Sequence, residues 1–169
     1  MIKVVVTGSE STGKTKLAAQ LAKHFDAPMS TEFVRAYAAT KTGTLGYADH
    51  GPIAHGQIAS EDAAIARATD VVVLDTDLIS TVVYCEHYLG ECPAWIADAA
   101  RSRAADLYLL LEPDVPWIPD GVRDRGDRRK EMHALFESTL RDLALRYIRI
   151  GGSWDQRFER AVAAVAAMR

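Results

Sequence analysis

The sequence predicts a single α/β domain over residues 1–169, built on a parallel sheet of about five strands with helices on both faces. Two observations predict this class. Short runs of β-branched residues alternate with longer segments of helical periodicity, which is typical of consecutive β-α units. A chain of 169 residues, 49% hydrophobic and 25% charged, also has the size and composition of one globular domain that can bury a core without disulfides.

The expected strands are short and apolar. Ile2 to Thr7 opens the chain, while Val71 to Asp75 and Asp106 to Leu111 are apolar runs suited to strands buried on both faces. Tyr147 to Ile150 comes last, and Pro28 to Thr31 is a weaker fifth candidate. Helix-length segments separate the strands, so we expect the strands to run parallel.

Helical periodicity fills most of the intervals. The first interval places Leu17, Leu21 and Phe25 on one face of a helix. Further segments with helical spacing are residues 54–68, residues 93–104, residues 132–143 and the alanine-rich C-terminal stretch. Residues 113–127 interrupt the pattern with three prolines, two glycines and four aspartates. They predict a long lid-like loop, extending over about residues 113–130, and long loops in compact domains are usually functional.

A phosphate-binding loop joins the first strand to the first helix. Residues 8–15 read G-S-E-S-T-G-K-T and fit the Walker A pattern G-x-x-x-x-G-K-[ST]. The glycines let the backbone wrap around phosphates, Lys14 reaches the β- and γ-phosphates, and the Thr15 hydroxyl binds Mg²⁺. The sequence therefore predicts a three-layer P-loop NTPase fold that uses ATP and Mg²⁺. The expected nucleotide contacts here are Thr7, Gly8, Ser11, Thr12, Gly13, Lys14 and Thr15.

An acidic residue ends the third expected strand. Asp75 follows a buried apolar run and resembles a Walker B aspartate, which shares the metal with the Walker A hydroxyl. Asp77 lies two residues further on. It either points into the same crevice or caps the following helix.

Two absences narrow the class of P-loop protein. The chain contains no asparagine, so it lacks the N-K-x-D motif by which switch GTPases read guanine. Thr76 stands where ring-forming ATPases carry a glutamate that orients water. These absences favour a kinase, which needs a bound hydroxyl acceptor, a nearby base and a cover that excludes water.

Residues for all three requirements are present. Glu32 follows the second expected strand, where it lies across the cleft from the phosphate-binding loop, and Arg35 is close enough to contact acceptor or phosphate. The plainer alternative is a helix-start glutamate with a solvated arginine partner. The base is one of Glu32, Asp75 and Asp77. The cover is the charged segment of residues 120–130, whose candidate arginines are Arg123, Arg125, Arg128 and Arg129.

Four segments together resemble the ribosylnicotinamide kinase domain of the NadR-type proteins. They are the G-x-E-S-T-G-K-T loop, Glu32-Phe33-Val34-Arg35-Ala36-Tyr37, Leu74-Asp75-Thr76-Asp77 and Pro116-Trp117-Ile118-Pro119-Asp120-Gly121-Val122-Arg123. The resemblance covers nearly the whole chain. It implies ATP-dependent phosphorylation of the 5′-hydroxyl of nicotinamide riboside. The family's additional adenylyltransferase and DNA-binding regions have no counterpart before Met1, so a free-standing kinase is expected.

The resemblance also implies acceptor contacts. These are Glu32, Arg35, Tyr37, His55, Asp77, Trp117 and Asp120. The Trp117 ring suits a flat cationic base. Gln57 lies near His55 and is a further candidate, and Trp154 either contacts adenine or packs its helix. Two alternatives stay open: a kinase for another nucleoside or small hydroxyl metabolite, and a non-catalytic ATP sensor.

Composition limits the partners and the compartment. A formal charge of -3 argues against a general nucleic-acid binder. No apolar stretch reaches the roughly 20 residues of a membrane span. Cys85 and Cys92 are too few for a disulfide-stapled secreted scaffold and favour a reducing compartment, so we expect a cytoplasmic protein. A homo-oligomer is compatible with the sequence.

Overall fold

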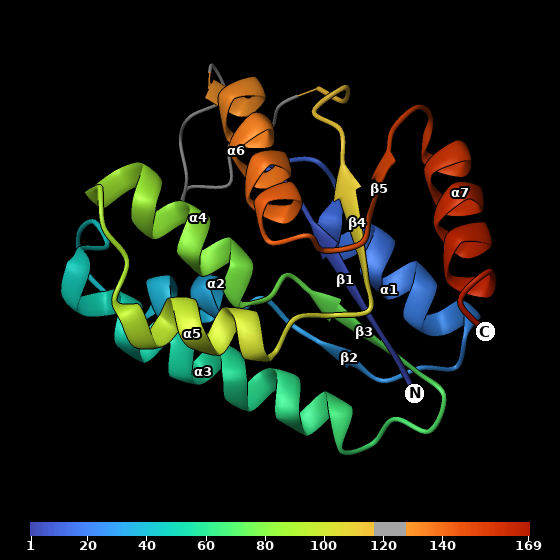
Figure 1. The fold of residues 1–169 in the computed structure, drawn as a ribbon, viewed down its shortest axis with the longest axis horizontal. Helices are drawn as coiled ribbons and strands as arrows, with labels where there is room; N and C mark the ends of the chain where they lie inside the picture. Colours follow the sequence, from blue (N-terminus) through green and yellow to red (C-terminus); the bar gives the residue numbers. More distant parts are fainter. Residues whose placement is uncertain (117–127) are drawn as a thin grey trace.

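The computed structural model describes residues 1–116 and 128–169. Its middle layer is a five-stranded sheet in the order β2-β3-β1-β4-β5, and neighbouring strands within the described residues pair in parallel (Figure 1). The strands are β1 (Ile2–Thr7), β2 (Met29–Ser30), β3 (Val71–Asp75), β4 (Leu107–Leu111) and β5 (Tyr147–Ile150). The predicted α/β class with about five parallel strands is confirmed.

Helices cover both faces of the sheet (Figure 1). They are α1 (Lys14–His24), α2 (Phe33–Ala39), α3 (Tyr47–Ile65), α4 (Leu78–Leu89), α5 (Ala94–Ser102), α6 (Arg129–Asp142) and α7 (Trp154–Ala166). Helices α1 and α7 pack on one face, whereas α3, α4, α5 and α6 pack on the other. Within the described residues, no helix combines the length and the apolar character needed to cross a bilayer.

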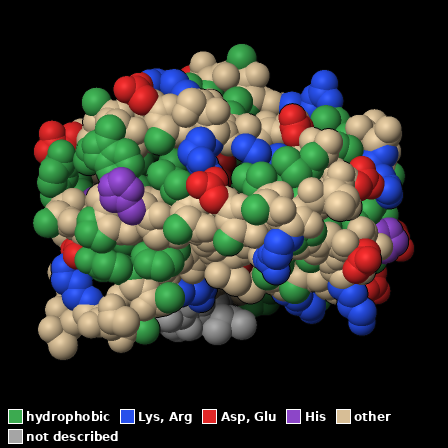
Figure 2. All heavy atoms as spheres, turned by 90° about the horizontal axis from the view of Figure 1, so that it is seen from below, with side chains coloured by type: hydrophobic (Ala, Val, Ile, Leu, Met, Phe, Trp, Pro, Cys, Tyr) green, Lys and Arg blue, Asp and Glu red, His purple; other side chains and the backbone are tan. Residues whose placement is uncertain are grey.

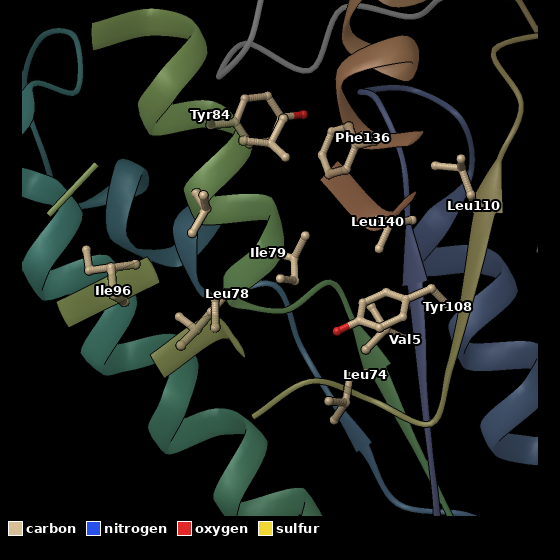
Figure 3. Close-up of a cluster of buried hydrophobic side chains, with 14 of the residues drawn as sticks. Val5, Leu74, Leu78, Ile79, Tyr84, Ile96, Tyr108, Leu110, Phe136 and Leu140 are labelled. Carbon is tan, nitrogen blue, oxygen red and sulfur yellow. The ribbon is translucent and has the colours of Figure 1, made fainter. Parts of the chain in front are cut away.

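Side-chain alternation along the strands divides the core into two layers. In β1, Val4 and Val6 face α1 and α7, while Val5 faces the opposite helices. On that second side the rings of Tyr84 and Phe136 meet edge to face, with centroids 5.7 Å apart (Figure 3). Burying each such side chain stabilises the fold by about 1.5–3 kcal/mol.

Several element boundaries differ from the expected ones. The helix expected over residues 54–68 begins earlier, at Tyr47, and contains Pro52. Its start is fixed by Asp49, whose side chain accepts a hydrogen bond from the Gly46 amide at 2.7 Å. The weak strand expected over residues 28–31 is only Met29–Ser30. Strand β4 begins one residue late, because the Asp106 carboxylate accepts from the Lys3 amide.

The sheet topology brings the carboxyl ends of β1, β2 and β3 together at one edge. Because the sheet is parallel, β1, β2 and β3 end at the same edge, and each is followed by a loop that carries polar residues. The chain moves from β1 outward to β2 on one side and later from β3 across to β4 on the other. Ligands of open α/β sheets bind at such a reversal of strand order.

Candidate functional site

The loop between β1 and α1 takes a shape that only glycine permits at two positions. Gly8 has a φ of 133°, and a Cβ there would lie 2.9 Å from the Leu111 carbonyl oxygen. Gly13 has a φ of 89°, and a Cβ there would lie 2.5 Å from the Trp154 ring. Ser11 also adopts a left-handed φ, of 52°. This conformation agrees with the predicted phosphate-binding loop.

Polar side chains of the loop fold back over its own backbone. The Lys14 ammonium donates to the Ser9 carbonyl at 2.8 Å, and the Thr12 hydroxyl donates to the same oxygen at 2.9 Å. Lys14 is therefore held over the loop at the start of α1. Thr7 lies behind this arrangement, fully buried, with its hydroxyl 3.4 Å from that of Ser80.

The structure brings Thr15 and Asp75 together. The Thr15 hydroxyl donates to one Asp75 carboxylate oxygen at 2.6 Å. The other oxygen, Oδ1, is buried and has no hydrogen-bond partner among the described residues. Burial raises the pKa of Asp75, and the neighbouring Glu32 carboxylate raises it further. A buried carboxylate oxygen beside a hydroxyl is the donor set that Mg²⁺ prefers, so these residues fit the predicted metal site.

Glu32 and Arg35 lie beside this pair. Glu32 is buried immediately before α2, and its carboxylate accepts from the Arg35 guanidinium at 2.7 Å. Both charges act on the pKa of Asp75, since Glu32 raises it and Arg35 lowers it. The ends of β2 and β3 thus hold two carboxylates and an arginine close to the phosphate-binding loop.

Tyr37 connects α2 to α3 through a hydrogen bond. Its hydroxyl donates to Asp49 at 2.8 Å, and Lys41 pairs with the same carboxylate. The Gly46 amide, followed by Lys41 and Tyr37, lowers the pKa of Asp49 to about 2. Tyr37 therefore stabilises the start of α3 through its hydroxyl.

Asp77 caps α4. Its carboxylate accepts from the Ile79 amide at 3.0 Å and from the Tyr108 hydroxyl at 2.8 Å. Burial raises its pKa to about 6. Of the two predicted alternatives the structure shows the helix cap. Both oxygens are engaged in these bonds, and a role for Asp77 in proton transfer or acceptor binding stays a prediction.

Trp154 packs on the phosphate-binding loop. Its ring covers Gly13, the Lys16 ammonium lies 4.6 Å from the ring centroid, and the Arg157 guanidinium lies 5.4 Å from it. The side chain remains 43% exposed. Packing is thus what the structure shows for Trp154, and its contact with adenine stays a prediction.

Arg157 is a site residue that sequence reasoning missed. It is 1% exposed, and its guanidinium donates to the carbonyls of Thr12, Gly152 and Glu112 at 3.1, 2.9 and 2.9 Å. It also pairs with Asp114. A signal was present, because Arg157 falls on the same helical stripe as the buried Ala161 and Val165. An arginine in such a stripe needs buried acceptors.

Glu10 was also missed, although it lies inside the phosphate-binding loop. It is 1% exposed, and one oxygen accepts from the Tyr84 hydroxyl at 3.4 Å. The other has no hydrogen-bond partner among the described residues. Its charge acts on Arg129, a buried residue at the start of α6 that donates to the Val115 carbonyl. Glu10 therefore links the loop to α4 and α6.

Comparison with known proteins identifies the family. A family model described as an AAA domain matches residues 3–157. The chain belongs to this AAA-domain family. The trifunctional NAD biosynthesis/regulator protein NadR of Escherichia coli (strain K12) is 32% identical over 172 residues, covering 98% of this chain and 42% of NadR. The predicted resemblance is thus confirmed as homology to part of NadR, and the chain spans less than half of that relative's length.

Solved structures agree with this assignment. A NadR protein in complex with NR superposes with a TM-score of 0.81 at 28% identity, covering 97% of this chain and 50% of the other. A NadR protein with NAD and AMP-PNP gives 0.79 at 26% identity, with 97% and 48% coverage. Thymidylate kinase from Ehrlichia chaffeensis shares the fold alone, with a TM-score of 0.68 at 12% identity and coverage of 99% and 98%.

The predicted cover, residues 120–130, is described only from residue 128 onward. Four predicted site residues, Trp117, Asp120, Arg123 and Arg125, lie outside the described residues. Arg128 lies at the edge of α6, where its guanidinium donates to Glu131 at 2.6 and 2.5 Å. Contact between Arg128 and nucleotide stays a prediction.

His55 is a predicted acceptor contact whose role stays a prediction. It lies exposed on α3 and stacks on the Trp95 ring of α5, with centroids 4.6 Å apart. Two residues further on, Gln57 is 3% exposed and faces the core. Residues two apart on a helix point about 200° apart, so the two side chains cannot share a face.

The outer surface and the two cysteines lie outside the cluster of polar residues described above. The face viewed in Figure 2 carries basic and acidic side chains interspersed, with hydrophobic side chains gathered toward its left end. Cys85 is buried and Cys92 half-buried, and burial raises the pKa of both thiols. Such thiols pack as small hydrophobic groups.

Proposed function

We propose that this chain is an ATP-dependent kinase that phosphorylates the 5′-hydroxyl of nicotinamide riboside, giving nicotinamide mononucleotide. The observation that carries the proposal is the gathering of Lys14, the Thr15–Asp75 pair and Glu32 at one edge of the sheet. A P-loop with a metal-binding pair and a separate carboxylate suits phosphoryl transfer to a hydroxyl. Homology to NadR, seen in complex with NR, supplies the acceptor.

The phosphate-binding loop and Lys14 hold the triphosphate. Backbone N–H groups of residues 8–15 and the positive end of α1 face the anion. Thr15 and Asp75 would hold Mg²⁺, which when bound neutralises charge on the β- and γ-phosphate oxygens. Arg157 keeps the loop in register with the segments after β4 and β5, because its guanidinium bonds to the carbonyls of Thr12, Glu112 and Gly152.

Glu32 is the base in this proposal. The acceptor's hydroxyl oxygen forms a bond to the γ-phosphorus, and the bond from that phosphorus to the β,γ-bridging oxygen breaks, which releases ADP. The hydroxyl proton passes to the Glu32 carboxylate. Arg35 orients this carboxylate through its hydrogen bond.

A coupled assay of ADP release tests the proposal. The chain is incubated with Mg·ATP and, separately, with nicotinamide riboside, other nucleosides and small hydroxyl vitamins. We expect nicotinamide riboside to stimulate release most strongly and to gain one phosphoryl group by mass. Stimulation by a different nucleoside would replace the acceptor, and ATP binding with no stimulation by any acceptor would favour a sensor.

A further inference from the structure

The amide of Gln57 connects two segments of the site. Its oxygen accepts from the Phe33 amide at 3.0 Å, and its nitrogen donates to the Thr76 carbonyl at 3.4 Å. The same nitrogen donates to Glu61 on the next turn of α3 at 3.3 Å. A peptide N–H only donates and a peptide carbonyl only accepts, so these partners fix the orientation of the amide.

The two residues that Gln57 contacts through their backbones directly follow the two carboxylates of the site. Phe33 comes after Glu32, and Thr76 comes after Asp75. The ladder between β2 and β3 ends at the pair Ser30 and Leu74. Beyond that point strand pairing no longer fixes the distance between the segments, and Gln57 spans them instead.

Thr76 occupies a backbone conformation that needs support. It is not a glycine, yet its φ is 64°, which costs about 1–2 kcal/mol for such a residue. Its amide donates to the Val6 carbonyl at 3.0 Å, and its carbonyl accepts from Gln57. Thr76 is thus held through both of its flanking peptide groups, so the direction in which the chain leaves Asp75 is set by β1 and by Gln57 together.

We propose that Gln57 is a positioning residue that sets the separation between Glu32 and the Thr15–Asp75 pair. The inference rests on the proposed function for its effect on phosphoryl transfer. A glutamine is suited to this role because one planar group presents an acceptor and a donor. An ionised glutamate of the same shape offers only acceptors and leaves the Thr76 carbonyl without its donor.

The variant Gln57→Glu tests this role with almost no change in volume. We expect kcat to fall by about 10²-fold, since a displacement of about 1 Å in a reacting pair has this effect. We expect the KM for ATP to stay within about threefold, because the phosphate-binding loop is not touched. Gln20→Glu, an exposed site on α1, controls for the added charge and should match the wild type.

The double variant Gln57→Glu/Glu61→Gln separates positioning from folding. The exchanged pair can restore the hydrogen bond between the two side chains and the acceptor for Arg103, which donates to Glu61 at 3.3 Å. It cannot restore a donor to the Thr76 carbonyl. We expect the melting temperature to recover part of its loss while kcat stays low. Recovery of both together, or a kcat for Gln57→Glu within twofold of the wild type, would overturn the inference.

A readout that needs no acceptor keeps the two proposals apart. Calorimetry gives the affinity for ADP with and without Mg²⁺. If Gln57 positions Asp75, Gln57→Glu should weaken the Mg²⁺-dependent gain in affinity by about tenfold, as loss of supporting residues around a metal does, and leave the metal-free affinity unchanged. An unchanged gain would overturn the inference. If the wild type shows the Mg²⁺-dependent gain in ADP affinity but does not phosphorylate nicotinamide riboside, this result would count against the proposed function alone.

Discussion

Lys14 is buried at the start of α1, and its ammonium lies across the phosphate-binding loop on the Ser9 carbonyl. In that position it contributes charge to the site and little to the core. Thr15, Asp75 and Glu32 act in the same way, since each is placed by backbone geometry and each carries a charge or a hydroxyl. In the proposed function these residues would therefore act on turnover separately from stability.

The variant Lys14→Ala should abolish turnover while the chain still folds. Loss of a cation that stabilises the transferring phosphoryl group is expected to lower kcat by about 10³-fold or more. Lys23→Ala, on the exposed last turn of the same helix, is the matched control. A rate for Lys14→Ala close to that of the control would contradict the assigned role.

The variant Trp117→Ala tests the acceptor side. If the ring stacks on a cationic base, its loss should raise the KM for nicotinamide riboside by about tenfold and leave the KM for ATP almost unchanged. Trp95→Ala, which removes an exposed tryptophan from α5, is the control. Equal changes in both Michaelis constants would remove the stacking role.

Glu61 makes the stability depend on pH. Burial, followed by repulsion from Asp77, raises its pKa from 4.5 to about 7 in the folded chain. The folded state therefore binds this proton more tightly than the unfolded state, and the stabilisation is lost as the pH rises. Relative to Glu61→Gln, the wild type should lose about 2 kcal/mol between pH 5 and pH 8, measured by urea unfolding. Parallel pH curves would contradict this assignment.

At the scale of elements, helices hold the loops of the site in register. Arg157 of α7 bonds to the carbonyls of Thr12, Gly152 and Glu112, which belong to three separate loops. Gln57 of α3 connects the segments after β2 and β3 in the same way. The loops are therefore fixed by polar side chains that project from packed helices.

The variant Arg157→Met should affect stability and nucleotide binding together. Several buried acceptors would lose their donors, so unfolding free energy should fall by about 3 kcal/mol or more. The KM for ATP should rise by about tenfold, because the Thr12 end of the phosphate-binding loop loses its anchor. Arg160→Met, exposed on the same helix, should change neither quantity by more than the error. A lower stability with an unchanged KM would show that Arg157 does not position the loop.

Local patterns predicted most of the elements, and long-range contacts account for part of what was missed. The loop at residues 8–15 and the buried run ending at Asp75 are local signals, and both lie where predicted. The early start of α3 also has a local signal, since Asp49 caps Gly46 three residues earlier, but Pro52 interrupts the helical pattern and this start was missed. By contrast, the bond from Gln57 to Thr76 joins residues 19 positions apart, which sequence spacing does not reveal.

At the scale of the molecule, a parallel sheet places chemically useful loops at one edge. Strands β1 and β3 are neighbours in the sheet although they are far apart in the sequence, so the phosphate-binding loop and Asp75 meet. Strand β2 next to β3 adds Glu32. Glu32, the proposed base, therefore lies beside the Thr15–Asp75 pair as a consequence of strand order β2-β3-β1.

The most direct test of the central claim follows the phosphoryl group itself. Nicotinamide riboside is incubated with the chain, Mg²⁺ and ATP labelled on the γ-phosphorus, and the product is identified by mass and by phosphorus NMR. The proposed function predicts nicotinamide mononucleotide that carries the label on its 5′-oxygen, formed in equal amount to ADP. Labelled inorganic phosphate with unmodified nicotinamide riboside would contradict it.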